Sequence, residues 1–201
     1  MLVNDSHLTT IWVDETDQEI KIIDQRLLPH ELSIVTLSTV KDVEFAIREM
    51  QVRGAPLIGV TAAFGMYVAA LEDSSIEFLN KAADFLIESR PTAVNLSWAI
   101  KKIKLEISNI DQQNRAEHIF NIAKKIREED ISACSKIGDY GFELIKNVYD
   151  KKNSTVNILT HCNAGWLAAV DWGTALAPIF KAKKNKIPIH VWVDETRPRN
   201  Q

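Results

Sequence analysis

The stretch from Ala55 to Leu71, APLIGVTAAFGMYVAAL, contains no charged residue. It approaches the roughly 20 residues that a helix needs to cross a membrane, so it belongs either in lipid or in a protein interior. Its content of Gly, Ala and Thr, and the ordinary amphipathic segments on both sides, favour a central helix that neighbours pack against closely. The stretch therefore predicts the core of a helical domain and no membrane span.

The segments around this stretch also predict helices. Apolar residues recur at helical spacing from Val40 to Met50, directly after a Ser38-Thr39 cap signal. Further helices are expected over residues 75–89, 92–108 and 115–147. Glycine is a poor helix former, so we expect a break in the last of these near Gly138 or Gly141. The helical domain is predicted to span residues 38–150.

A small β extension is predicted before it, over residues 1–37. Three short runs there, TIWV, EIKIID and LSIVTL, are rich in β-branched or alternating apolar residues. A polar turn, DETDQ, separates the first two runs. This pattern is typical of a small β element.

The pattern changes again in residues 151–201. TVNILT predicts a strand, HCNAG a turn, WLAAVDWGTALAPIF a helix and IPIHVWVDE a second strand. A strand, helix and strand of this length form a βαβ unit, which belongs in a parallel sheet. Two parallel strands do not make a stable sheet alone. The predicted fold class is α/β: a helical domain with a small β extension, then the first βαβ unit of an incomplete Rossmann-like sheet.

Composition restricts the partners. The chain is 46% hydrophobic and 25% charged, which is typical of a globular protein, and its formal charge is −3. No basic cluster suggests nucleic acid or a polybasic membrane anchor, so we expect a small-molecule partner. Two cysteines and a start without a signal-peptide pattern favour a reducing cytoplasm.

Cys162 is the first candidate for chemistry. It lies in THCNAG, just past a predicted parallel strand and at the predicted start of a helix, where ligands usually bind and where a helix dipole can lower a thiol pKa. The alternative is a small buried hydrophobic residue, the commoner fate of a free cysteine. His161 is adjacent, but neighbouring strand residues point to opposite faces, so structural support of the turn is an equal alternative to a Cys-His pair.

Two arginines precede predicted helices that begin with proline. Arg53 lies in VRGAP, where Gly54 allows a close turn, and Arg90 lies in RPTAVNL. Either could bind a phosphate through two parallel hydrogen bonds, although such arginines are more often solvated or paired with surface acids.

Other polar candidates carry weaker signals. The charged residues of DETRPRNQ cluster at the end of the second strand and fit either a ligand site or a solvated loop: Asp194, Glu195, Arg197, Arg199 and Gln201. Three residues have no supporting context and are interpreted as core or surface positions: Cys134, His30 and His118.

Six segments together are more specific than any one of them. They are DQRLLPH, VRGAPLIGVTAAFG, RPTAVNL, LTHCNAG, GTAL and DETRPRNQ. The order and approximate spacing of these six segments resemble those of the methylthioribose-1-phosphate isomerases. The resemblance covers essentially the whole length of the chain. This family also contains ribose-1,5-bisphosphate isomerases and regulatory subunits of translation initiation factor 2B. The exact sequences RGAP, RPTAVNL and HCNAG favour the methionine-salvage branch of the family.

The resemblance implies a helical domain followed by a Rossmann-like domain, usually in a homodimer. It assigns Cys162 as the catalytic cysteine, and substrate binding to Arg53, Gly54, Ala55, Arg90 and Gln201. The family continues for well over a hundred further residues that supply most of the sheet, a catalytic aspartate and a phosphate-site lysine. We therefore expect this truncated chain to be inactive alone. Trp166 and Asn200 are smaller departures from the family's pattern.

The implied substrate is a furanose whose anomeric oxygen carries phosphate, so its ring cannot open spontaneously. An isomerase must supply a general acid at the ring oxygen and manage hydrogen between C2 and C1. The resemblance assigns the general acid to the family's catalytic aspartate, and the handling of hydrogen at C2 to the cysteine. The sequence contains neither a metal cluster nor a complete nucleotide fingerprint, so no metal or cofactor is expected. The alternatives are a regulatory or binding module of the initiation factor type, or an isomerase for a related pentose phosphate.

Overall fold

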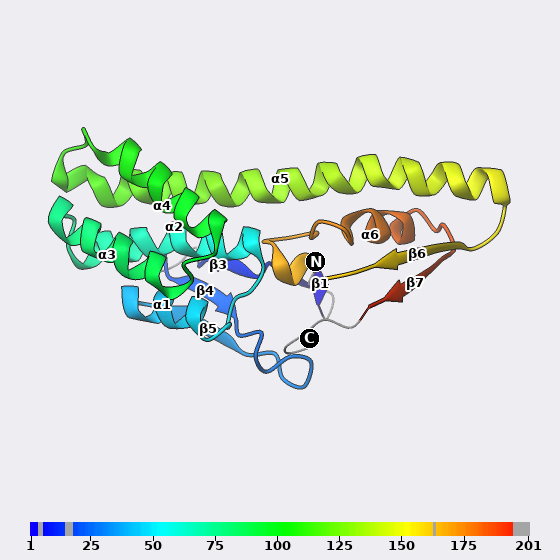
Figure 1. Cartoon of the computed structure of the whole chain (residues 1–201), viewed down its shortest axis with the longest axis horizontal. Coiled ribbons are helices and arrows are strands. Elements are labelled where there is room, and N and C mark those ends of the chain that lie inside the picture. The colour runs from blue at the N-terminus through cyan, green and yellow to red at the C-terminus, as the bar shows by residue number, and fades with distance from the viewer. Residues whose placement is uncertain (4–5, 15–17, 163, 195–201) are drawn as a thin grey trace.

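A computed structural model gives the arrangement of the chain and describes residues 1–3, 6–14, 18–162 and 164–194. One long helix, α5 (Gln112–Lys152), runs along the length of the molecule (Figure 1). The helices before it are α1 (Val40–Arg48), α2 (Ala55–Glu72), α3 (Ile76–Ser89) and α4 (Val94–Ile107). These four lie at the end of the molecule where α5 begins, and the elements that follow α5 lie at its other end (Figure 1).

The N-terminal strands form two small antiparallel sheets; the three predicted runs become one of them, and nothing in the sequence indicated the other, the β1-β2 pair. The strands are β1 (Leu2–Val3), β2 (Ser6–His7), β3 (Ile11–Val13), β4 (Ile20–Ile23) and β5 (Ile34–Leu37). β1 pairs with β2, and β4 lies between β3 and β5 with Ile22 opposite both Ile11 and Val35. Ile11 and Ile22 are fully buried, so the apolar face of this sheet joins the helical core.

The helical core is built around α2, which confirms the prediction from its uncharged sequence. Nearly every residue from Leu57 to Ala70 is buried. By length and composition α2 could cross a membrane, but 78% of it is buried inside the protein, as a core helix is. A Cβ atom built at Gly59 would lie only 3.0 Å from the Asn95 carbonyl oxygen. Small residues therefore let α4 approach α2 closely.

The start of α1 confirms the predicted cap. The Thr39 side chain accepts a hydrogen bond from the Asp42 N–H, and the Asp42 carboxylate accepts one from the Thr39 N–H. This reciprocal pair satisfies two backbone donors that a helix start leaves free.

The predicted break in α5 is wrong, because α5 is one continuous helix through Gly138 and Gly141. A Cβ atom built at Gly141 would lie 2.3 Å from Cγ of Pro178, and one at Gly138 would lie 2.9 Å from Cε of Lys181. Both glycines thus face α6 (Ala177–Lys184) at a distance that a side chain would prevent. They serve helix packing, and the packing outweighs their low helix propensity.

The two predicted strands of the last segment are confirmed. β6 (Val156–Thr160) and β7 (Ile189–Val193) pair in parallel, with Val156 opposite Ile189. α6 lies between β6 and β7 in the chain and packs on α5. The described part of the chain is therefore α/β, with a helical bundle and small sheets.

The helix predicted over residues 166–180 is wrong in its extent. A 3₁₀ turn, η1 (Trp166–Ala168), comes first, and α6 begins only at Ala177. Positive φ angles at Gly165, Trp172 and Gly173, of 129°, 63° and 78°, are incompatible with a helix through this segment. Residues 165–176, which we call the strap, consist of the 3₁₀ turn, bends and turns, and Val170 within them joins the core of the helical bundle.

Candidate functional site

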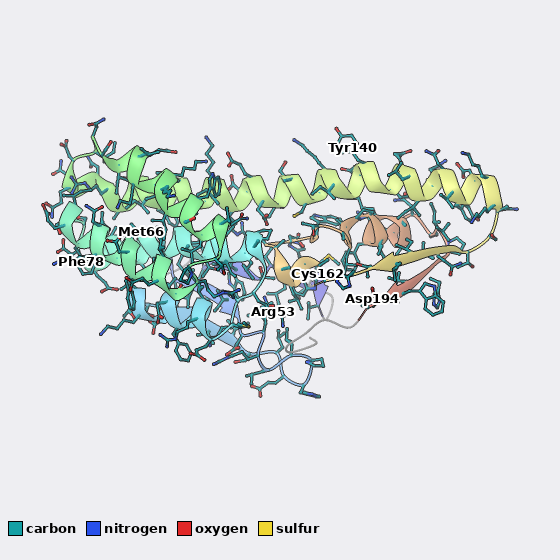
Figure 2. All side chains as sticks on the ribbon, viewed as in Figure 1. Arg53, Met66, Phe78, Tyr140, Cys162 and Asp194 are labelled. Atoms are coloured by element: carbon teal, nitrogen blue, oxygen red, sulfur yellow. The ribbon has the colours of Figure 1, made fainter. Side chains whose placement is uncertain are left out.

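The VRGAP motif meets the segment that directly follows HCNAG, where the helical bundle adjoins the strap. Gly54 has a φ of 105°, and a Cβ atom built there would lie 2.4 Å from both Cα and the carbonyl oxygen of Ala168. Only glycine permits this approach of two backbones. The start of α2 therefore packs directly on η1, which follows HCNAG in the chain. Figure 2 shows Arg53 and Cys162 in this region, between the bundle and β6.

The DQRLLPH motif braces the same junction. The Gln25 side chain donates to the Leu167 carbonyl at 2.7 Å, and the Gln25 N–H donates to the Gln51 carbonyl at 2.9 Å. Gln51 in turn donates to the Asp24 carboxylate at 2.7 Å. Burial raises the pKa of Asp24, but hydrogen bonds from Arg26 and Gln51 outweigh it and hold this pKa below its ordinary value. A charged carboxylate thus anchors the junction at neutral pH.

Three further side chains hold the strap, and sequence reasoning gave no indication of them. The Thr10 hydroxyl donates to the Ala169 carbonyl at 2.6 Å, and the Asp130 carboxylate accepts from the Val170 N–H at 2.9 Å. Asp171 accepts from His7 at 2.8 Å. Thr10 and Asp130 lie in ordinary strand and helix patterns, so only the tertiary contacts reveal their role.

Arg53 is only 7% exposed and lies directly before the Gly54 contact, so it belongs to this junction. Arg90 caps the end of α3 and is half-buried. Its motif reaches α2 through Asn95 at Gly59, but no described contact brings Arg90 to Cys162. The structure therefore joins the Arg53 motif to the strap, and the role of Arg90 stays a prediction. Ala55 is the first residue of α2.

Cys162 lies in the turn directly after β6, and the expectation that it begins a helix is wrong, because the next element is the short 3₁₀ turn. The residue is exposed, so the alternative of a small buried hydrophobic residue is also wrong. Its φ of 73° is rare for a residue with a side chain. Strained backbone of this kind clusters at functional sites, which supports a role for Cys162.

His161 does not form a pair with Cys162 in the described contacts. Its Nδ1 atom lies 3.2 Å from the Asp194 carboxylate, so this contact joins the ends of β6 and β7. Both side chains are exposed. The contact favours the structural alternative for His161. Four residues of the DETRPRNQ cluster lie outside the described residues: Glu195, Arg197, Arg199 and Gln201.

The second cysteine is unsuited to chemistry. Cys134 is 2% exposed, and burial together with the nearby Asp130 carboxylate raises its pKa to about 12. It is a core residue, as expected. His30 is exposed and His118 is half-buried. Among the described residues, no cluster of three or more His, Cys, Asp or Glu side chains could hold a metal ion.

Comparisons with known proteins agree with the motifs. The model of the Initiation factor 2 subunit family matches residues 51–201. The chain is 50% identical to a methylthioribose-1-phosphate isomerase of Sinorhizobium medicae and 47% identical to one of Escherichia coli, over its whole length. It spans 56% and 55% of those two proteins, about half the length of the curated relatives that it matches.

Two solved structures are similar. The 5-methylthioribose 1-phosphate isomerase of Pyrococcus horikoshii matches with a TM-score of 0.82 and 37% identity, over 96% of this chain and 54% of that one. The delta subunit of translation initiation factor eIF-2B from A. fulgidus matches with a TM-score of 0.81 and 37% identity, over 97% of this chain and 56% of that one.

Proposed function

The chain belongs to the Initiation factor 2 subunit family, and we propose that it forms the N-terminal part of an aldose–ketose isomerase that converts 5-methylthioribose 1-phosphate to 5-methylthioribulose 1-phosphate. One observation carries this proposal: relatives bearing that name are about half identical to the chain across its full length, with 50% identity in Sinorhizobium medicae. The junction supports it, because VRGAP and DQRLLPH both contact the η1 turn that directly follows HCNAG.

We propose that a complete active site needs a segment like the one that the relatives carry beyond the part matched here. In this arrangement residues 1–37 are the β extension, 38–150 the helical domain and 151–201 the start of a Rossmann-like domain. Parallel strands are normally covered on both faces. Leu159 in β6 and Val193 in β7 are 68% and 73% exposed, as expected of a sheet that lacks such cover.

The chemistry assigned to this chain is substrate binding and work at C2. Phosphate on the anomeric oxygen blocks spontaneous ring opening, so a general acid must protonate the ring oxygen as its bond to C1 breaks. Hydrogen then leaves C2 and is gained at C1 while the C2 hydroxyl becomes the ketone, which needs no outside oxidant. Cys162 acts beside C2, and Arg53 and Arg90 bind phosphate. The acid belongs to the further segment.

The remaining expectations complete this proposal. The substrate is a small sugar phosphate, Gly54, Ala55 and Gln201 contribute to its binding, and no cofactor or metal takes part. The complete enzyme is a homodimer of the cytoplasm and binds neither nucleic acid nor membrane.

A second candidate function is a non-catalytic regulatory module. The observation that favours it is the eIF-2B delta subunit of A. fulgidus, whose TM-score of 0.81 nearly equals that of the isomerase. Against it stands Cys162, which keeps a strained, accessible position inside the THCNAG motif.

A chimera tests the proposal. The 201 residues are fused to the segment of the Sinorhizobium medicae relative that lies beyond the matched part, and isomerisation of 5-methylthioribose 1-phosphate is assayed after removal of host isomerase. The chimera should be active and the chain alone inactive. Cys162→Ser should reduce turnover by orders of magnitude and leave affinity within about tenfold, because it removes a transition-state role.

Three results would count against this assignment. Equal turnover of the Cys162→Ser chimera would demote the cysteine to a structural residue. A folded chimera that neither binds nor converts the sugar phosphate would favour the regulatory module. Cysteine-dependent turnover by the chain alone, near that of a full-length relative, would show that the acid is misplaced.

A further inference from the structure

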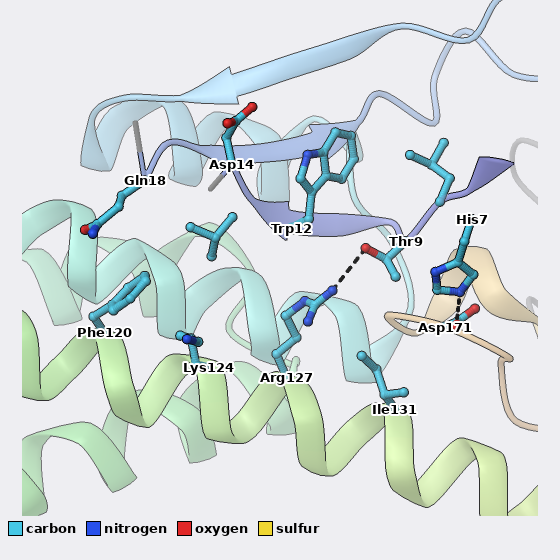
Figure 3. Close-up of a pocket in the computed structure, with 12 residues that line it drawn as sticks. His7, Thr9, Trp12, Asp14, Gln18, Phe120, Lys124, Arg127, Ile131 and Asp171 are labelled. Atoms are coloured by element: carbon cyan, nitrogen blue, oxygen red, sulfur yellow. Dashed lines mark hydrogen bonds and ion pairs between the residues drawn. The ribbon is translucent and has the colours of Figure 1, made fainter. Parts of the chain in front are cut away.

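A groove beside the junction lies between the N-terminal strands and α5, and it shares His7 and Asp171 with the contacts that hold the strap. It has a volume of about 710 Å³, within the range of small-molecule sites. Figure 3 shows its lining, with β3 and the residues before it on one side and α5 on the other. None of its lining residues belongs to the six motifs. The proposed isomerase chemistry therefore leaves the groove unexplained.

The groove combines aromatic side chains with two cations, an exposed lysine and an arginine held by hydrogen bonds. Trp12 lines it from β3, and Phe120 lines it from α5. The Lys124 ammonium lies 5.5 Å from the centroid of the Phe120 ring. Arg127, one turn further along, donates through Nε to the Ile11 carbonyl at 3.1 Å and through Nη2 to the Thr9 hydroxyl at 3.2 Å. These two bonds use only part of the five guanidinium donors and fix its orientation.

The acids of the groove are occupied by other partners. The Asp14 carboxylate lies 2.6 Å from the Lys21 ammonium, and Asp171 contacts the N-terminal amine at 2.6 Å and His7 at 2.8 Å. Within the described part of the chain, neither Lys124 nor Arg127 lies within ion-pair distance of a carboxylate. Burial lowers the pKa of Arg127 by partly desolvating its charge, although attraction to the Glu128 and Asp171 carboxylates raises this pKa in part. The groove thus presents positive charge beside two half-buried aromatic side chains, Trp12 and Phe120.

We propose that this groove binds a nucleoside monophosphate, with the phosphate on Lys124 and Arg127 and the base against the aromatic wall. Arginine and lysine are the phosphate binders that such a site uses, and every base has a face that stacks on an aromatic ring. The Gln18 amide also lines the groove and can hydrogen-bond a base edge. A bare sugar phosphate would leave the aromatic wall unused, so the site favours a ligand that has both parts.

The test is titration calorimetry on the 201-residue chain with adenosine 5′-monophosphate as the probe. Adenosine supplies the base without the phosphate, and ribose 5-phosphate supplies the phosphate without the base. We expect the monophosphate to bind at least about tenfold more tightly than either part, because both contacts contribute. Equal affinity for adenosine and its monophosphate, or no binding of the monophosphate at about 1 mM, would overturn the proposal.

Matched variants locate the site. Lys124→Gln should weaken monophosphate binding about tenfold and leave adenosine binding unchanged, since it removes one charge-assisted contact. Lys125→Gln is the control, because Lys125 is the exposed neighbour that does not line the groove. Phe120→Leu should weaken the monophosphate and adenosine together. Equal effects of Lys124→Gln and Lys125→Gln would show that the ligand binds elsewhere.

Discussion

At one end of α5, the apolar residues of α2 are enclosed by helices and by the β3-β4-β5 sheet, whereas at the other end β6 and β7 leave Leu159, Trp192 and Val193 exposed. Both regions are rich in apolar side chains. The difference lies in the number of neighbours: α2 packs against four other helices, while the two strands are supported by contacts from α5 and α6. A pair of parallel strands needs neighbours on both faces and at both edges of its sheet, whereas a helix inside a bundle is already surrounded by its neighbours.

This contrast divides the described chain into a part whose apolar side chains are enclosed and a part whose strand side chains stay exposed. The candidate site lies on the boundary. Gly54 and Gln25 belong to the enclosed part, and the strap that they contact leads to the exposed Cys162.

The two cysteines give the sharpest measure of the contrast. Cys162 should react rapidly with a thiol reagent in the folded chain, while Cys134 should react at least about a thousandfold more slowly, because it is buried and its pKa is raised to about 12. Stopped-flow labelling measures both rates. Cys162→Ser should remove the fast phase, and denaturant should expose the slow thiol. Comparable rates for the two thiols in the folded chain would contradict the contrast.

Truncation in the enclosed core should have a large effect on stability. Phe64 is fully buried in α2, so Phe64→Ala should lower the free energy of unfolding by about 3–5 kcal/mol through lost burial and a residual cavity. Urea unfolding followed by far-UV circular dichroism measures this change. A cost below about 1 kcal/mol would mean that the bundle is loosely packed.

The boundary itself should show a pH dependence. Burial raises the pKa of the Asp130 carboxyl, although the hydrogen bond that it accepts from the Val170 N–H lowers this pKa in part. The folded state therefore keeps the proton on the Asp130 carboxyl to higher pH than the unfolded state does. Protonation of Asp130 contributes its full stability below about pH 4, and this stability is lost as the pH rises through the raised pKa of the folded state.

Asp130→Asn, which cannot titrate but keeps an acceptor for Val170, should therefore gain stability relative to the native chain as the pH rises from about 4 to about 7. Unfolding free energies at several pH values test this. Parallel curves for the two proteins would show that Asp130 titrates normally. We expect a smaller change than that from the core truncation.

The smallest effect is expected in the exposed sheet. Leu159→Ala should change the free energy of unfolding by no more than about 0.5 kcal/mol in this chain, because the side chain is 68% exposed. In the chimera with the relative's further segment, the same substitution should cost about 2 kcal/mol or more, since the sheet face is then covered. An equal small effect in both proteins would show that the added segment does not cover β6.

Much of the fold could be predicted because the signals were local. The uncharged run predicted α2, the Ser38-Thr39 signal predicted the cap at Thr39, and two β-branched runs predicted β6 and β7. The amino-acid sequences of the six motifs identified the family. Errors arose where packing overrode local preference: Gly138 and Gly141 indicated a break in α5, but both glycines admit α6 at close range.

The candidate site divides in the same way. The sequence by itself determined which motifs are candidates for chemistry, because the amino-acid sequence alone fixes functional groups such as the Cys162 thiol and the Arg53 guanidinium. Only the tertiary structure decided that Gly54 meets Ala168, that Gln25, Thr10 and Asp130 hold the strap, and that Cys162 is exposed. The physical reason is range: helix and strand propensities act over a few neighbouring residues, whereas exposure and close backbone contact depend on segments far apart in the chain.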